Sequence, residues 1–169
     1  AVVVGGGFIG VEVAENLVHR GIATTIVEAL PQIMGPLDPE MAWILTEHVR
    51  ANGVDIRLGS QVTAIGAADV TLADGTTLPA DVVVAAIGVK PDTTLAEAAG
   101  LRIGERGGIW VDAELRTSVP HIWAVGDAVE KTDALDGGAA LVPLANTANR
   151  QGRLVADLIA GRTGRSRKV

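Results

Sequence analysis

Residues 1–30 read AVVVGGGFIGVEVAENLVHRGIATTIVEAL, and this stretch decides the fold. The apolar run at Val2–Val4 predicts a parallel strand that is buried on both faces. A glycine turn follows, and apolar residues then recur at helical spacing until Gly21, which is typical of a helix end. Residues 23–27 are rich in β-branched side chains and predict a second strand. This order of strand, glycine turn, helix and strand predicts a Rossmann-like α/β unit.

The turn after the first strand has the spacing G-x-G-x-x-G at Gly5, Gly7 and Gly10. In this pattern the first glycine turns tightly, the second lets the backbone approach a pyrophosphate, and the third lets the helix pack on the strand. The helix N-terminus then faces the phosphates. Because a strand precedes the turn and a helix follows it, we expect this loop, with Phe8 and Ile9, to bind a dinucleotide.

An acidic residue, Glu28, ends the second predicted strand. A carboxylate there accepts hydrogen bonds from the adenosine ribose hydroxyls of NAD, whereas the 2′-phosphate of NADP would face it with like charge. No lysine or arginine stands between Glu28 and Arg50. The sequence therefore predicts NAD(H) rather than NADP(H); an acid that merely ends a strand is the alternative.

The rest of the chain predicts further helices and strands, in one group up to Gly88 and a second group beyond it. Up to Gly88 we expect a helix from Pro39 to about Asn52, strands at 54–58 and 81–87, and short strands joined by turns within 61–80. Beyond Gly88 we expect a helix at 94–99, strands at 107–111 and 122–125, a polar loop at 128–140, and a long helix from about Leu144 to Ala160.

Composition excludes several classes of function. The chain has 169 residues, a net charge of -6 and no cysteine, so a redox role has to use an external cofactor. The three histidines have no metal-ligand spacing, and we expect no metal site. A sequence pI of about 5.0 argues against a nucleic-acid partner. Neither a membrane-spanning run nor a signal peptide is visible, which predicts a cytoplasmic protein without a membrane partner.

Two carboxylates have open interpretations. Asp127 ends the apolar stretch Ile122–Val125 with Gly126 before it, which would place a carboxylate at the carboxyl edge of a sheet, where α/β proteins bind ligands. A strand that ends in a plain turn is the alternative. Glu12 is expected in the first turn of the first helix, either opposite the helix dipole or as a nicotinamide-side contact.

Five segments in this order carry a resemblance: GGGFIGVEVAE (5–15), TIVEALPQIMGPLDPEMA (25–42), AAIGVKPDT (85–93), IWVDAELRTSVPHIWAVGDAVE (109–130) and LVPLANTANRQGR (141–153). They resemble the FAD-dependent pyridine nucleotide–disulfide oxidoreductases, most closely the branch of coenzyme A-disulfide reductase, NADH oxidase and NADH peroxidase. The resemblance implies a Rossmann-like NAD(H)-binding domain at 1–88, with a β-meander. Residues 89–169 would form the second segment of a discontinuous FAD-binding domain.

The same resemblance implies where the cofactors bind. It assigns Gly126-Asp127 to the flavin ribitol, and the backbone N–H groups of Leu144 and Ala145 to the pyrimidine end of the flavin. Glu12 would lie near the nicotinamide, and Gly88 would be a backbone neighbour of that ring. It implies no catalytic side chain within this chain.

We therefore expect a fragment of an FAD-dependent NAD(P)H oxidoreductase. Hydride would pass from NADH to the flavin, and electrons would reach a disulfide, peroxide or oxygen through a cysteine outside this chain. Two alternatives stay open: a ferredoxin or rubredoxin reductase-type flavoprotein, and a stand-alone NAD-binding module that senses redox state. The parent is expected to be a homodimer, and the fragment alone to be inactive and to self-associate.

Overall fold

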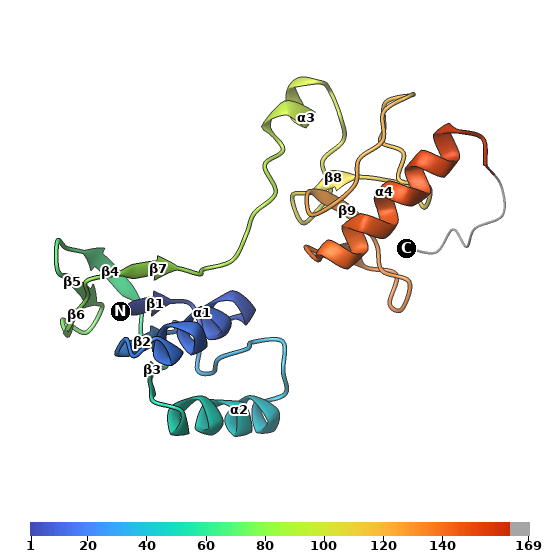
Figure 1. The fold of residues 1–169 in the computed structure, drawn as a ribbon. Coiled ribbons are helices and arrows are strands. Elements are labelled where there is room, and N and C mark those ends of the chain that lie inside the picture. The colour runs from blue at the N-terminus through green and yellow to red at the C-terminus, as the bar shows by residue number, and fades with distance from the viewer. Residues whose placement is uncertain (163–169) are drawn as a thin grey trace. The chain divides into compact units, whose positions relative to one another are not determined.

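The computed structural model of the chain describes residues 1–162. The chain divides into two compact units, Ala1–Gly88 and Val89–Val169, which we call unit 1 and unit 2 (Figure 1). Each unit has its own hydrophobic core and its own strand pairing. Unit 1 contains the glycine turn, and unit 2 contains the Gly126-Asp127 segment.

The main sheet of unit 1 is parallel, with four strands in the order β3-β2-β1-β7. Its elements are, along the chain, β1 (Val2–Val4), α1 (Phe8–His19), β2 (Thr24–Val27), α2 (Pro39–Ala51), β3 (Val54–Arg57) and β7 (Val83–Ala85). Asp38 is the N-cap of α2 and Pro39 its first residue, as the sequence predicts. This arrangement confirms the Rossmann-like α/β fold.

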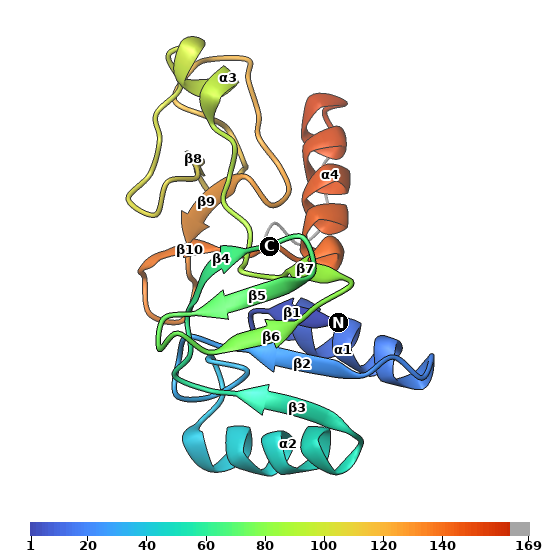
Figure 2. The same cartoon turned by 90° about the vertical axis from the view of Figure 1, so that its left-hand side faces the viewer.

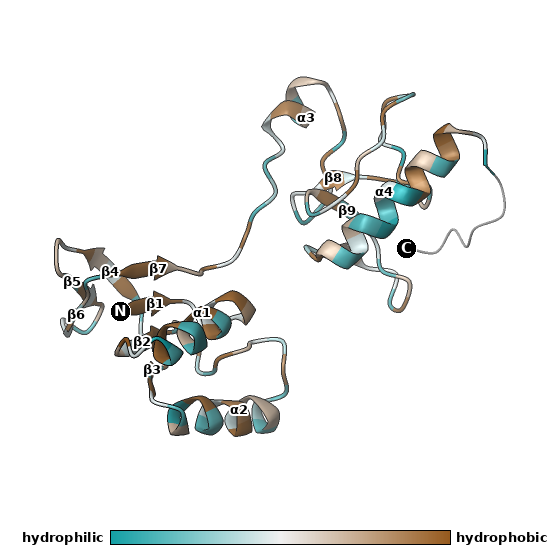
Figure 3. Cartoon of the chain, viewed as in Figure 1, coloured by the Kyte–Doolittle hydropathy of each residue, from teal (hydrophilic) through white to brown (hydrophobic). Residues whose placement is uncertain are grey.

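Successive residues of the central strands belong to two different cores. Val3 packs into the core on the helix side, whereas Val2 packs into the core on the opposite face. In β2 the buried side chains of Ile26 and Val27 divide in the same way. Because neighbouring side chains point to opposite faces, a strand covered on both sides carries apolar residues at successive positions, as Val2 and Val3 do. Figure 3 shows β1 coloured hydrophobic.

The opposite face is covered by an antiparallel meander. Its strands are β4 (Val62–Ile65), β5 (Asp69–Leu72) and β6 (Thr77–Pro79). Val70 and Leu72 are buried against the core formed by β1 and β2. In the turn that follows β5, the backbone N–H of Thr76 donates to Oδ1 of Asp74 at 2.8 Å. The parallel sheet therefore lies between a helical layer and a second, smaller sheet (Figure 2).

Unit 2 is built around a small mixed sheet and one long helix. Its elements are α3 (Thr94–Ala98), β8 (Ile109–Trp110), β9 (Val129–Thr132), β10 (Ala139–Leu141) and α4 (Ala145–Ile159). The strand β9 lies between the other two, parallel to β8 and antiparallel to β10. Its core contains Val111, Leu115, Val129 and, from α4, Leu154.

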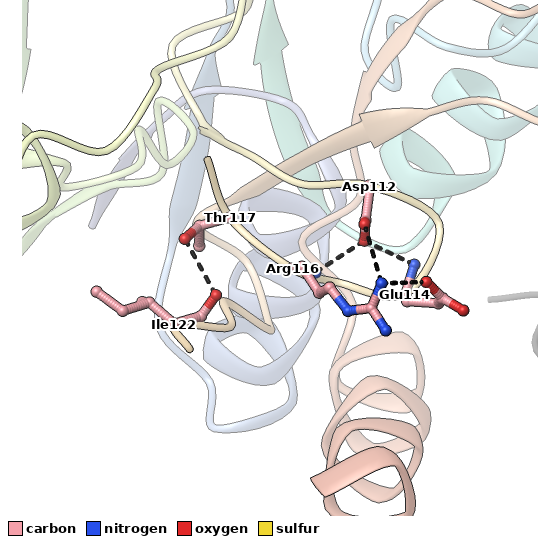
Figure 4. A network of polar contacts seen from close by, with 5 residues as sticks. All are labelled: Asp112, Glu114, Arg116, Thr117 and Ile122. Carbon is pink, nitrogen blue, oxygen red and sulfur yellow. Dashed lines mark hydrogen bonds and ion pairs between the residues drawn. The ribbon is translucent and has the colours of Figure 1, made fainter. Parts of the chain in front are cut away.

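One strand predicted for unit 2 is absent. Residues 122–125 form no strand, and Trp123 makes only an isolated bridge, to Arg116. The segment is held by a preceding loop instead: the N–H and the hydroxyl of Thr117 both donate to the carbonyl of Ile122, each at 3.0 Å (Figure 4). The apolar run at 122–125 thus lies outside the named strands of the sheet.

That loop is held together by its own polar groups. Oδ1 of Asp112 accepts the backbone N–H groups of Glu114 and Arg116, each at 2.9 Å (Figure 4). The Arg116 guanidinium lies 2.8 Å from the Glu114 carboxylate. These local contacts fix the shape of the chain that leads to the Gly126-Asp127 segment.

The prediction of a loop at 128–140 is also wrong, since these residues include β9 and most of β10. Hydropathy does not predict β9, because two of its four residues, Glu130 and Lys131, are charged. Glu130 is only 3% exposed, because its carboxylate accepts the backbone N–H groups of Glu105 at 2.7 Å and Arg106 at 2.6 Å. A buried charge is tolerated where hydrogen bonds replace its hydration.

Candidate functional site

The glycine turn lies where the order of the main sheet reverses. From β1 the chain proceeds to β2 on one side, while β7 pairs with β1 on the other side. Gly5 directly follows β1, and Gly88 lies three residues beyond the end of β7 at the same carboxyl edge. Such a switch point opens a crevice between the loops of neighbouring strands, and α/β proteins bind nucleotides there.

The three motif glycines have different surroundings. Gly5 has a φ of +105°, and a Cβ there would overlap the carbonyl oxygen of Ala86. A Cβ at Gly10 would overlap the carbonyl oxygen of Gly5. At Gly7 a Cβ would meet no atom within 4 Å. Two of the glycines thus allow strand, turn and helix to approach one another, and the third faces open space into which a ligand fits.

The first turn of α1 carries no side-chain cap. Gly7 is its N-cap, and among residues 1–162 no side chain bonds to the first N–H groups and no acidic residue lies in the first turn. Those N–H groups lack intrahelical acceptors and face a site that suits an anion. Phe8 and Ile9, which lie there, are 65% and 55% exposed. The residues present therefore fit the pyrophosphate of a dinucleotide.

The predicted position of Glu12 needs correction. It is the fifth residue of α1 and lies beyond the first turn, because the helix begins at Phe8. Its side chain is exposed, and its backbone carbonyl accepts a hydrogen bond from Nδ2 of Asn16 at 2.8 Å. Compensation of the helix dipole in the first turn is therefore not its role.

Glu28 is bonded to the glycine loop, which sequence reasoning missed. Its Oε2 accepts the N–H of Gly6 at 2.6 Å, and its Oε1 accepts the N–H of Leu30 at 2.8 Å. The carbonyl of Gly6 in turn accepts the N–H of Met34 at 2.7 Å. The carboxylate thus lies half-buried at the rim of the loop, and each of its oxygens keeps a further lone pair. No sequence pattern signals this bond, because Gly6 is the unspecified position of the motif.

One basic residue near Glu28 was also overlooked. Arg57 ends β3 opposite Val27, and its carbonyl accepts the N–H of Glu28 at 2.8 Å. Its guanidinium is engaged by Asp55, with Nε and Oδ2 2.9 Å apart. The positive charge of Arg57, beside the end of β2, is therefore already paired with Asp55 on β3.

The second predicted group of residues lies in unit 2, against α4. Gly126 has a φ of +87°, and its N–H donates to Oε1 of Gln151 at 2.6 Å. A Cβ at Gly126 would lie 3.9 Å from the Cβ of Ala148. The loop that carries the exposed Asp127 is thereby brought to the first half of the helix.

The N-terminus of α4 resembles that of α1. Within residues 1–162 its N-cap residue makes no side-chain cap bond and its first turn has no acidic residue, although the N–H of Thr147 donates to Oδ1 of Asn146 at 2.7 Å. Leu144 is the N-cap, and its N–H already donates to the carbonyl of Val142 at 2.9 Å. The first helical residue, Ala145, is among those whose N–H has no intrahelical acceptor. The N-terminal turn fits a polar group of a flavin, with Ala145 rather than Leu144 as donor.

Shifted pKa values occur away from these two sites. The backbone N–H and hydroxyl of Thr76 hold the pKa of Asp74 below its usual value, and the hydroxyl and N–H of Thr94 do the same for Asp92. Both carboxyls are fully exposed. Within residues 1–162, no group of His, Cys, Asp and Glu side chains is arranged to hold a metal ion, and no helix has the length and apolarity needed to cross a bilayer.

Comparison with known proteins gives consistent matches. The family model described as pyridine nucleotide-disulphide oxidoreductase matches residues 1–152. An NADH oxidase of Methanocaldococcus jannaschii is 37% identical over 163 residues, which cover 94% of this chain and 36% of that protein. A 5,5'-dehydrodivanillate O-demethylase ferredoxin reductase subunit of Sphingobium sp. is 36% identical over 167 residues, 94% of this chain and 40% of that protein.

Solved structures agree with these matches. The crystal structure of reduced Bacillus anthracis CoADR-RHD superimposes with a TM-score of 0.93 and 45% sequence identity, covering 97% of this chain and 30% of that chain. The chain thus spans between about a third and two fifths of the two curated relatives described above.

Proposed function

This chain belongs to the pyridine nucleotide-disulphide oxidoreductase family, and from that premise we propose that it is part of a flavoprotein that oxidises NADH. Unit 1 binds NAD(H), and unit 2 contributes one segment of the FAD site. The observation that carries the proposal is the uncapped N-terminus of α1, with open space at Gly7, on the switch-point edge between β1 and β7. This combination suits a pyrophosphate.

Two groups of unit 1 hold the two halves of the adenosine diphosphate moiety. The free N–H groups of the first turn of α1 donate to the pyrophosphate. Glu28 accepts hydrogen bonds from the ribose hydroxyls with the lone pairs that Gly6 and Leu30 leave unused. The hydrogen bond from the Gly6 N–H also keeps the Glu28 carboxylate beside the glycine loop. The ribose contact of Glu28 and the pyrophosphate contact of the loop are therefore held at a fixed distance from each other.

The charge at Glu28 favours NADH over NADPH. A 2′-phosphate facing the carboxylate at 4 Å would cost about 4 kcal/mol per charge pair at an effective dielectric constant of about 20. The nearest basic side chain in the sheet, Arg57, is bonded to Asp55. It therefore offers little compensation for the phosphate.

The nicotinamide half extends toward β7 in this proposal. Gly88, with a φ of +95° and open space where a Cβ would be, offers its backbone as a neighbour of the ring. Glu12 lies one turn into α1 with its side chain exposed. It is the acid of unit 1 that we assign to the nicotinamide side.

On the flavin side, the residues of unit 2 bind and orient. FAD, when bound, accepts the hydride equivalent and passes the electrons on. Asp127 accepts hydrogen bonds from ribitol hydroxyls, and the N–H of Ala145, at the positive end of α4, supports negative charge on the flavin pyrimidine. Asp127 is exposed, and its side chain makes no hydrogen bond within residues 1–162, which supports this assignment.

The final electron acceptor defines two candidate functions. A disulfide, peroxide or oxygen acceptor would use a redox cysteine outside this chain, because the chain has none. The likeness to a relative named as a ferredoxin reductase subunit favours a protein acceptor as the second candidate. Both candidates share the transfer from NADH to flavin.

We also propose that the parent is a homodimer and that the isolated chain self-associates. Support comes from large apolar side chains that unit 2 leaves exposed, among them Leu95 at 84% and Leu135 at 97%. Exposed apolar surface of this kind favours contact with another protein surface.

Titration of the chain with NADH and NADPH by calorimetry tests the assignment of unit 1. We expect NADH to bind at least tenfold more tightly, and Glu28→Gln to remove most of that preference. Glu47→Gln, on the exposed face of α2, is the matched control and should leave it intact. Equal affinities in the wild type would refute the role of Glu28, and the absence of binding by either nucleotide would refute the assignment of unit 1.

A further inference from the structure

We propose that Gln151 is a positioning residue for the flavin site, which holds the Gly126-Asp127 loop so that the Asp127 carboxylate faces the ligand. This inference rests on the proposed function of unit 2. Gln151 lies on α4, is 1% exposed, and accepts the N–H of Gly126 through Oε1 at 2.6 Å. It joins the loop to the helix whose N-terminus supplies the other flavin contact.

A glutamine at this place is there for its hydrogen bond. Neighbouring positions of α4 that face the core carry apolar side chains, such as Leu154 and Leu158. An apolar side chain of similar size would fill the volume without the desolvation cost of a buried amide. The feature that only a polar side chain supplies is an acceptor for the N–H of Gly126.

The Gln151 bond is made next to Asp127 and therefore affects the orientation of that residue. Gly126 adopts a left-handed conformation, with a φ of +87°, directly before Asp127. The only other hydrogen bond that an atom of Gly126 makes within residues 1–162 is long: its carbonyl accepts the N–H of Val129 at 3.3 Å. Loss of the Gln151 bond therefore frees the peptide that orients Asp127, while β9 and α4 keep their own contacts.

The Gln151–Gly126 hydrogen bond also holds two proposed flavin contacts, Asp127 and the first turn of α4, at a fixed spacing. Gly126 lies near Ala148 in the first half of α4, so the loop lies beside the helix whose first turn supplies the other contact. Contacts that bind one ligand at two points require a fixed spacing between them. Gln151 fixes that spacing without touching the flavin.

The test uses the complete parent protein, freed of any flavin that it carries after purification. Gln151→Met removes the acceptor while keeping the length of the side chain. Leu154→Met, on the same helix and in the core, is the matched control for packing. The readouts are amide hydrogen exchange of Gly126 in the apoprotein, the dissociation constant for added FAD, and the visible absorption spectrum of the bound flavin.

For Gln151→Met we expect exchange of the Gly126 amide to become at least fivefold faster and the FAD dissociation constant to rise about five- to tenfold. The flavin bands should shift, and the melting temperature should fall no further than in the control. Asp127→Ala should weaken FAD binding by itself. In that background, adding Gln151→Met should cause little further loss, since the two residues act through one contact.

Two results would overturn the inference: unchanged FAD affinity in Gln151→Met, or a loss that simply adds to that of Asp127→Ala. Either result would leave the glutamine with a packing role only. If the wild-type protein binds no FAD, the proposed function fails instead. The exchange rate of the Gly126 amide in the apoprotein still measures whether the bond holds the loop.

Discussion

The two units of this chain reach a folded state by different means. At the centre of unit 1 lies β1, whose three residues are all valine, and Val2 and Val3 pack into opposite cores. Unit 2 has a smaller sheet of strands two to four residues long, and its buried side chains include the polar ones of Thr117, Glu130 and Gln151. The glycine loop of unit 1 combines close backbone packing at Gly5 and Gly10 with the hydrogen bonds of Gly6, whereas the Gly126 loop of unit 2 is joined to α4 by one side-chain hydrogen bond. Substitutions should therefore have different signatures in the two units.

The largest effect is expected in unit 1, at Gly10. A Cβ there would overlap the backbone carbonyl of Gly5, which has no room to move because β1 is buried. Gly10→Ala should lower the free energy of unfolding by about 3 kcal/mol, measured by urea denaturation. A loss below about 0.5 kcal/mol would show that the contact between turn and helix is not tight.

The matching experiment in unit 2 concerns Glu130. Glu130→Ala leaves the N–H groups of Glu105 and Arg106 without acceptors, and should cost about 2 kcal/mol. Trp110 and Trp123 report unfolding of this unit by fluorescence. The control, Glu105→Ala, removes an exposed carboxylate and should stay within about 0.5 kcal/mol of the wild type. Equal losses in the two variants would mean that the buried carboxylate does not hold the loop.

A third prediction separates ligand binding from packing within unit 1. Gly7→Ala places a methyl group in open space, so stability should change by less than about 0.5 kcal/mol. The same methyl group would stand where the pyrophosphate approaches, and NADH affinity should fall about tenfold or more. The account of the loop would fail if Gly7→Ala bound NADH as the wild type does.

These contrasts show why unit 1 could be predicted more fully than unit 2. The repeat of apolar residues predicts β1, α1, β2 and α2, because burial of one face or of both faces is recorded in the periodicity itself. The N-cap Asp38 and Pro39 add a local signal. In unit 2 the apolar run at 122–125 predicts a strand, but its hydrogen bonds go to the loop around Thr117.

The other features that the sequence does not predict depend on polar side chains with distant hydrogen-bond partners. The charge of Glu130 obscures β9, and nothing in the sequence distinguishes Gln151 from a surface residue of an amphipathic helix. The bond between Glu28 and Gly6 joins residues of two elements, so no local pattern contains it. Each of these groups depends on a partner distant in the sequence, and only the tertiary structure identifies that partner.

The smallest predicted effect is electrostatic. The hydroxyl and N–H of Thr94 hold the pKa of Asp92 below its usual value of 3.8, so the folded chain favours the ionised carboxyl. That contribution is present above pH 3.8 and is lost as the pH falls through the lowered pKa. Thr94→Ala should move the pKa of Asp92 back up toward its usual value in an NMR titration, whereas Thr94→Ser should not.

The most direct test of the central claim is a titration of the ¹⁵N-labelled chain with NADH, followed by the backbone amide signals. The claim is that the first turn of α1 and the glycine loop bind the pyrophosphate, with Glu28 at the ribose. It predicts that the largest shifts occur at the amides of Gly6, Gly7, Phe8 and Ile9, and that Gly7→Ala weakens the whole response. Saturable shifts confined to other segments, with the amides of this loop unchanged, would contradict it.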